Sequence, residues 1–110
     1  MHLYQFQEAS KRTLPKKGSD DDITNYALGL IGESAEVSEM IKKWRFHDHP
    51  LDRAKVAEEL GDVLHYLAGL CSLMNLNLEE VAAGNINKLK ARYPDGFDAK
   101  KSIERKSYYG

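Results

Sequence analysis

Two pairs of acidic residues are the part of this sequence best suited to chemistry. Glu33 and Glu36 are three residues apart in GESAE, and Glu59 and Asp62 are three apart in EELGD. Residues three apart on a helix are neighbours, so each pair places two carboxylates side by side. Alone, either pair is more typical of a solvated helix face, because charged residues make up 30% of the chain. Together, the pairs suit a divalent cation if the fold brings them to one place.

Two long helices are expected to position these residues. Apolar side chains recur at helical spacing over residues 23–45 and again from Asp52 to about residue 75, with residues 46–51 as the connecting loop. Two helices joined by a short loop fold back antiparallel. The apolar stripes that would face each other comprise Ile23, Tyr26, Ala27, Leu30, Ser34, Val37 and Ile41 on the first helix, and Val56, Leu60, Val63, Leu64, Leu67, Cys71 and Met74 on the second.

In such a hairpin, residues at the same height have a constant sum of their residue numbers. Glu33 with Asp62 and Glu36 with Glu59 have the same sum, and that sum lies close to the one set by the loop centre near residue 48. At about 100° per residue, Glu33 and Glu59 fall beside the apolar stripes, not opposite them. We therefore expect all four carboxylates within one helical turn, across a single groove.

A cluster of this kind needs a counter-ion. Like charges about 4 Å apart repel by roughly 1 kcal/mol in water and about 4 kcal/mol at an effective dielectric of 20. Protonation or cation binding relieves the repulsion. Cys71 is the single cysteine, and oxygen ligands favour Mg²⁺, or Mn²⁺, over zinc.

A line of polar residues further along the chain suits phosphate binding. Asn85, Lys88 and Arg92 fall within about 60° of one another on a predicted helix, and Val81 and Leu89 on the same face are expected to point inward. Arginine binds phosphate as a fork and lysine as a point charge. The alternative is a basic helix end that complements the negative pole of the helix dipole.

Aromatic and histidine residues give weaker signals. Trp44 and Tyr66 have flat faces on which a nucleobase can stack, although Tyr66 equally suits packing in a groove wall and Trp44 suits packing at a helix end better. His65 lies opposite the apolar stripe, which predicts a surface or interface position, and His47 and His49 fall in the loop. No nucleophile–base pair supports covalent catalysis.

The remaining segments complete an all-α prediction for one domain, residues 1–110. Residues 3–14 and 78–92 are expected to be helical, residues 93–96 form a turn, and residues 97–110 are a polar, basic tail with one helical turn around Ile103. The expected helix N-caps are Asp20, Asp21 or Asp22, then Asp52, and Asn77 with Glu80 in capping-box spacing.

Composition excludes several classes of protein. The 110 residues include 16 basic and 17 acidic side chains, a net charge of -1, whereas a nucleic-acid binder normally has a basic surplus. No apolar run approaches the roughly 18–20 residues of a membrane span, and the first residues lack the apolar core of a signal peptide. These features predict a cytoplasmic protein without nucleic-acid or membrane partners. A chain this small buries only about two thirds of its unfolded surface, which favours self-association.

Three sequence blocks in order, GLIGESAE, EELGD and NINKLKARYPDGF, resemble the MazG-like all-α nucleoside triphosphate pyrophosphohydrolases. The family pattern is E-E-x-x-E followed by E-x-x-D. Glu33 and Glu36 match its second and third glutamates, and Glu59 and Asp62 match the E-x-x-D pair. Gly32 stands where the family has its first glutamate, which leaves the general base unassigned.

The resemblance implies Mg²⁺-dependent cleavage of a nucleoside triphosphate between its α and β phosphates, for removal of unwanted nucleotides. It also implies a homodimer or homotetramer with a four-helix bundle around each site. Our mechanistic hypothesis makes Glu33, Glu36, Glu59 and Asp62 the metal ligands, Glu33 or Glu36 the group that orients the attacking water or accepts its proton, and Lys88 and Arg92 the contacts of the departing pyrophosphate.

Two other functions remain open. A non-catalytic oligomeric module that binds a nucleotide or a partner would retain the site without turnover, and Gly32 keeps this alternative open. A carboxylate-bridged di-iron bundle would normally need Glu-x-x-His on paired helices, and here only Asp62 and His65 come near that spacing.

Overall fold

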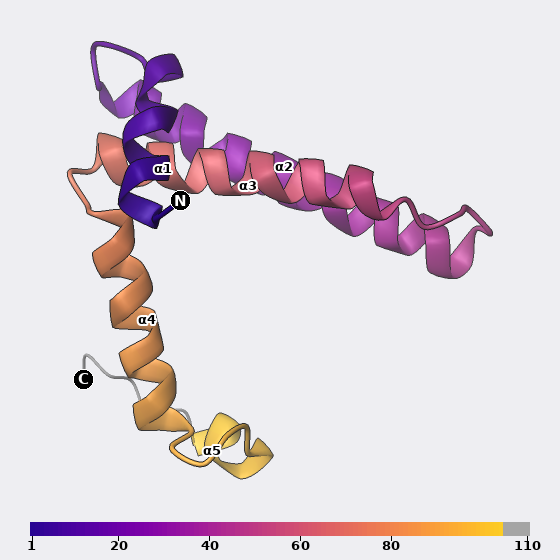
Figure 1. Ribbon diagram of the computed structural model, residues 1–110. Coiled ribbons are helices and arrows are strands. Elements are labelled where there is room, and N and C mark those ends of the chain that lie inside the picture. The colour runs from indigo at the N-terminus through magenta and orange to yellow at the C-terminus, as the bar shows by residue number, and fades with distance from the viewer. Residues whose placement is uncertain (105–110) are drawn as a thin grey trace.

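The computed structural model describes residues 1–104, and helices joined by short connections make up this part of the chain (Figure 1). The all-α prediction is confirmed. Of the predicted tail, residues 97–110, those beyond position 104 lie outside the described residues, and the predicted helical turn around Ile103 falls within a helix of residues 99–104. The elements are α1 (Leu3–Ser10), a short 3-10 turn η1 (Lys11–Thr13), α2 (Asp20–Phe46), α3 (Arg53–Leu73), α4 (Leu78–Arg92) and α5 (Ala99–Glu104).

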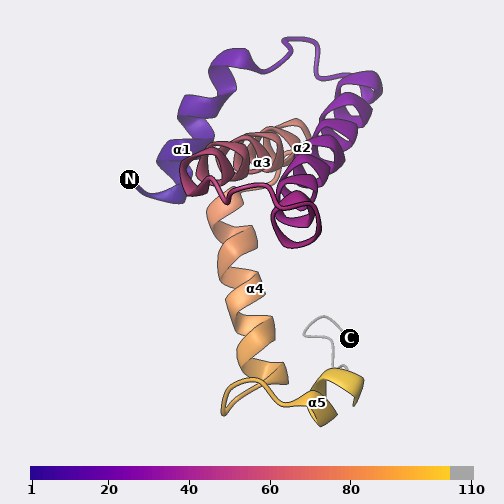
Figure 2. The ribbon, with the colours of Figure 1, turned by 90° about the vertical axis from the view of Figure 1, so that its right-hand side faces the viewer.

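Helices α2 and α3 form a long antiparallel hairpin (Figures 1 and 2). Two reciprocal pairs set its register: the ring of Tyr66 lies against Gly29, and the ring of Tyr26 lies against Gly69. A Cβ atom at either glycine would collide with the facing ring. The rings also contact each other edge to face, with centroids 5.3 Å apart. Both pairs have the same residue-number sum as the acidic pairs, so this close packing fixes the register of the carboxylates.

The helix starts differ from the prediction at α2. Its N-cap is Ser19, whose Oγ accepts a hydrogen bond from the Asp22 backbone N–H at 3.3 Å while the Asp22 side chain accepts one from the Ser19 N–H at 3.0 Å. The prediction of Asp20, Asp21 or Asp22 as the cap was therefore wrong, because these acids occupy the first turn and complement the helix dipole there.

The other two N-caps follow the prediction more closely. The Asp52 side chain accepts from the Lys55 N–H at 3.0 Å, which confirms that cap. The Asn77 side chain likewise accepts from the Glu80 N–H at 3.1 Å. The reciprocal hydrogen bond, from the Asn77 N–H to the Glu80 side chain, is not formed at α4, so only one of the two hydrogen bonds of a capping box is present.

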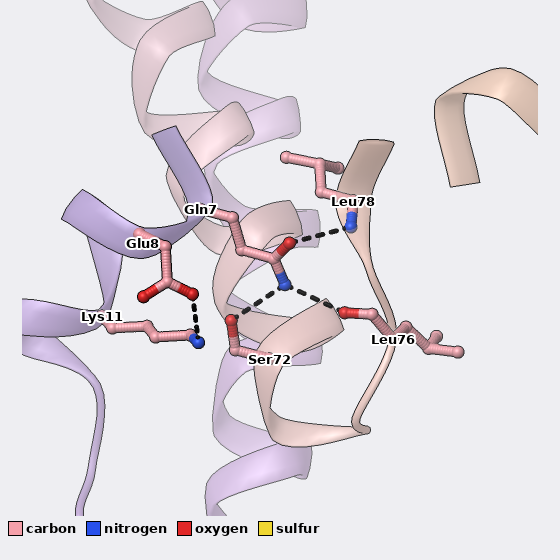
Figure 3. Close-up of polar contacts among 6 residues, drawn as sticks. All are labelled: Gln7, Glu8, Lys11, Ser72, Leu76 and Leu78. Atoms are coloured by element: carbon pink, nitrogen blue, oxygen red, sulfur yellow. Dashed lines mark hydrogen bonds and ion pairs between the residues drawn. The ribbon is translucent and has the colours of Figure 1, made fainter. Parts of the chain in front are cut away.

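A buried glutamine ties α1 to the turn between α3 and α4 (Figure 3). The Gln7 amide nitrogen donates to Ser72 Oγ at 3.1 Å and to the Leu76 carbonyl at 2.9 Å, and its oxygen accepts from the Leu78 N–H at 2.9 Å. Leu78 is the first residue of α4, where a backbone N–H has no partner within its own helix. One side chain thus fixes both the turn and the start of α4.

The core of the single chain is small. Ala68, Cys71 and Leu78 form its buried apolar cluster, and the predicted core position of Cys71 is confirmed. Several other positions expected to point inward are instead exposed, because α4 leaves the hairpin and the two long helices cover only one side of each other (Figure 2). These exposed residues are Ile41, Leu60, Met74, Val81 and Leu89. None of the helices in residues 1–104 has the length and apolar character needed to cross a membrane.

Candidate metal centre

The hairpin brings the acidic pairs together. Glu33 from α2 and Glu59 and Asp62 from α3 each offer a carboxylate oxygen, and these oxygens lie within 4.8 Å of one another. The carboxyl group of Glu36 lies within hydrogen-bonding reach of Glu59. Three of the predicted residues thus form a compact donor set, and the fourth adjoins it.

Burial leaves two oxygens of this cluster without partners. Glu59 is only 7% exposed, and the Oε2 atoms of Glu33 and Glu59 are buried with no hydrogen-bond partner in residues 1–104. A buried acceptor without a donor is unfavourable, and a bound cation would satisfy both oxygens. The all-oxygen donor set therefore fits Mg²⁺ or Mn²⁺.

The cluster also changes the acidity of its members. Hydrogen bonding to Glu59, followed by burial and by the charges of Glu36 and Asp62, raises the pKa of Glu33 from 4.5 to about 7. Proximity to Glu59 also raises the pKa of Glu36. Conversely, hydrogen bonding to Glu36 and Glu33 lowers the pKa of Glu59. A cation that binds the cluster would therefore compete with protons at Glu33 and Glu36.

The raised pKa of Glu33 predicts how the stability of the metal-free chain depends on pH. Between pH 4.5 and about 7 the folded chain holds a proton at Glu33 that the unfolded chain has lost. The free energy of unfolding should therefore fall as pH rises across this range. Urea denaturation in EDTA at pH 5.5 and pH 8 measures the change.

Two variants test whether Glu33 is the source of this pH dependence. Glu33→Gln should reduce the pH dependence, whereas Glu39→Gln, on the exposed pair of Glu39 with Lys42, should leave it unchanged. A Glu33→Gln chain that retains the full pH dependence would contradict the crowding of these carboxyl groups.

Lys55 is a neighbour of the cluster that the sequence analysis missed. Its Nζ lies 3.5 Å from Oε1 of Glu59 and 3.5 Å from Oε1 of Glu58. The charge of Glu58 and hydrogen bonding to Glu59 raise the pKa of Lys55. The spacing of four residues between Lys55 and Glu59 was the available signal, because such pairs face each other on a helix.

The predicted phosphate contacts lie elsewhere in the single chain. Asn85, Lys88 and Arg92 are on α4, which runs away from the carboxylate-bearing part of the hairpin (Figure 1). The Arg92 guanidinium lies over the Tyr93 ring, 6.0 Å from its centroid. One chain therefore does not bring these three residues to the carboxylates.

The two predicted base-stacking residues are also far apart. Tyr66 packs against Gly29, whereas Trp44 is 40% exposed near the hairpin loop with the Arg45 guanidinium 5.4 Å from its ring centroid. Trp44 lies fifteen residues beyond Gly29 on α2, roughly 22 Å along the helix axis. Within one chain they cannot stack on the same base.

The histidines do not join the cluster. His65 faces the N-terminal segment, with Nδ1 2.7 Å from Ser10 Oγ and Nε2 3.4 Å from Thr13 Oγ1. Both ring nitrogens are thus engaged away from Asp62, which disfavours the di-iron alternative. His47 and His49 are exposed at the hairpin loop.

Comparison with known proteins gives a consistent result. The model of the MazG nucleotide pyrophosphohydrolase domain matches residues 22–97. The gene 37 protein of Mycobacterium phage L5 is 32% identical over 101 residues, which cover 86% of this chain and 89% of that protein. The dCTP pyrophosphatases 1 of Mus musculus and Bos taurus are 31% and 30% identical over 77 residues, 64% of this chain but only 45% of each relative. No solved structure matches the chain.

Proposed function

Since this chain belongs to the MazG nucleotide pyrophosphohydrolase family, we propose that it hydrolyses nucleoside triphosphates to the monophosphate and pyrophosphate with Mg²⁺ as cofactor. At family level it is a hydrolase of phosphoric anhydrides. The observation that supports the finer proposal is the compact donor set of Glu33, Glu59 and Asp62 with two buried oxygens that lack partners. Its role is the removal of unwanted nucleotides in the cytoplasm, without nucleic-acid or membrane partners.

The site residues divide into two roles. Glu33, Glu59 and Asp62 would hold Mg²⁺, because their oxygens lie within 4.8 Å of one another. When bound, Mg²⁺ neutralises phosphate charge and lowers the pKa of water. Glu36 is exposed and lies beside this set, which supports a role in orienting the attacking water and accepting its proton; Glu33 is the other candidate for this step.

We propose that a second copy of the chain completes the site. Lys88 and Arg92 would neutralise the departing pyrophosphate, yet α4 carries them away from the carboxylates of its own chain (Figure 2). An open apolar hollow of about 540 Å³ beside Ile41, Val56 and Leu60 also remains uncovered. A homodimer or homotetramer would cover this surface and bring α4, with Asn85, to a neighbouring hairpin. Trp44 and Tyr66 could then stack on the base from different chains.

Mixing two inactive variants tests the shared site. Glu59→Gln removes the metal site of its own chain, and a Lys88→Ala/Arg92→Ala chain lacks the phosphate contacts. If each site combines two chains, equal co-refolding should restore about a quarter of wild-type activity, because half of the dimers are mixed and each mixed dimer has one intact site. Pyrophosphate release measures the recovery. Mixed dimers, verified with two affinity tags, that stay inactive would contradict the shared site.

The reaction is tested with a panel of ribo- and deoxynucleoside di- and triphosphates in Mg²⁺. We expect a triphosphate to yield one monophosphate and one pyrophosphate, both followed by ³¹P NMR. The relatives named dCTP pyrophosphatase make dCTP a first choice among the substrates. Release of a nucleoside diphosphate and orthophosphate would contradict the proposed bond cleavage.

The second candidate, a module that binds nucleotides without turnover, is favoured by one feature. Gly32 stands where the resemblance expects a glutamate, and the space around it is open within 4 Å of a Cβ built there. In the same panel, calorimetric binding of a nucleotide without pyrophosphate release would support this module.

A further inference from the structure

Lys55 places a cation directly against the most buried carboxylate of the cluster. Its Nζ lies 3.5 Å from Glu59 Oε1, and its side chain is half exposed. The other oxygen of Glu59, Oε2, is buried and has no partner in the described residues. One oxygen of Glu59 is therefore paired with a side chain of its own helix, and the other is not.

A divalent cation and this ammonium group compete for the same carboxylate. Both are positively charged, so an ion bound to Glu59 repels Lys55 at its present distance. Glu58 offers the ammonium a second position, because its Oε1 also lies 3.5 Å from Nζ. The Glu58 side chain is more exposed than that of Glu59, so a cation paired there remains in contact with water.

We propose that Lys55 regulates the divalent-cation affinity of the carboxylate cluster by competing for Glu59, with Glu58 as the alternative partner to which it withdraws. This inference rests on the proposed function, because it requires the cluster to bind a divalent ion. It assigns Lys55 a positioning role, since the side chain acts through Glu59 and not on the substrate.

Replacement of the ammonium by a neutral side chain of similar length is the first test. Lys55→Met should tighten Mn²⁺ binding about two- to fivefold, the effect expected for an exposed ion pair. Free Mn²⁺ is measured by electron paramagnetic resonance at constant pH and salt. Lys42→Met is the matched control, because it removes the same charge from an exposed pair with Glu39 on α2 and should change the affinity less.

The partner exchange is tested by a double-mutant cycle. Glu58→Gln should weaken Mn²⁺ binding, because Lys55 then pairs with Glu59 alone. In the Lys55→Met background the same Glu58 change should have a markedly smaller effect, since no ammonium remains to redistribute. Lys55→Arg should stay close to wild type.

The outcomes distinguish this inference from the proposed function. Unchanged Mn²⁺ affinity in Lys55→Met, or an equal gain in Lys42→Met, would overturn the role of Lys55 and leave the metal site standing. An effect of Glu58→Gln that is the same in both backgrounds would overturn the exchange. A wild-type chain that binds no Mn²⁺ would overturn the proposed metal site and this inference with it.

Discussion

Replacing Glu59 with glutamine should reduce Mg²⁺-dependent pyrophosphate release by more than about a hundredfold, because loss of even an outer-shell partner of a metal ligand costs about 10–100-fold. Glu59 is the most buried carboxylate of the cluster, and one of its oxygens has no partner. The glutamine keeps the shape of the side chain but removes a negative charge from a crowded site. Because the shape is kept, the metal-free variant should still fold.

Thermal denaturation with and without Mn²⁺ distinguishes loss of the metal site in Glu59→Gln from simple misfolding. Wild-type protein should gain melting temperature on Mn²⁺ addition, because an ion that binds only the folded state stabilises it, and Glu59→Gln should lose this gain. Glu39→Gln, on the exposed pair with Lys42, should retain both the gain and the turnover. Metal-dependent turnover preserved in Glu59→Gln would exclude Glu59 as a ligand.

Alanine at either tyrosine-facing glycine should destabilise the fold. A Cβ at Gly69 would collide with the buried ring of Tyr26, and one at Gly29 with the ring of Tyr66. Overpacking of this kind typically costs about 1–3 kcal/mol. Urea denaturation at fixed chain concentration measures the loss for Gly29→Ala and Gly69→Ala.

The hairpin contains its own controls for this experiment. A Cβ at Gly32 or Gly61 meets nothing within 4 Å, so alanine at these helical positions should stabilise the chain by about 0.5–1 kcal/mol. Equal responses at all four glycines would show that the rings do not set the register of α2 against α3.

The sequence sufficed to predict that the four carboxylates meet, for a physical reason. Helix rise is constant, so a short loop determines which residues of two antiparallel helices lie opposite each other. Glu33, Glu59 and Asp62 accordingly lie within one donor set. The glycine–tyrosine pairs that fix this register were not predicted, because a glycine in a helix does not reveal which ring packs on it.

The direction of α4 could not be predicted from its own residues. Its start depends on Gln7, which lies 71 residues before Leu78 in the sequence and satisfies its N–H. Apolar spacing indicated that Val81 and Leu89 are covered, but in the described residues they remain 42% and 38% exposed. The spacing of Lys55 to Glu59 was visible in the sequence, but their pairing was not predicted. At the start of α2, the hydroxyl of Ser19 serves as the N-cap in place of the three aspartates that follow it.

Anomalous diffraction from a crystal soaked in Mn²⁺ would show directly where the cation binds. We expect the strongest anomalous peak between α2 and α3, in contact with carboxylate oxygens of Glu33, Glu59 and Asp62. A well-ordered cluster with no peak among these side chains, or with its strongest peak elsewhere on the chain, would contradict the proposed metal site.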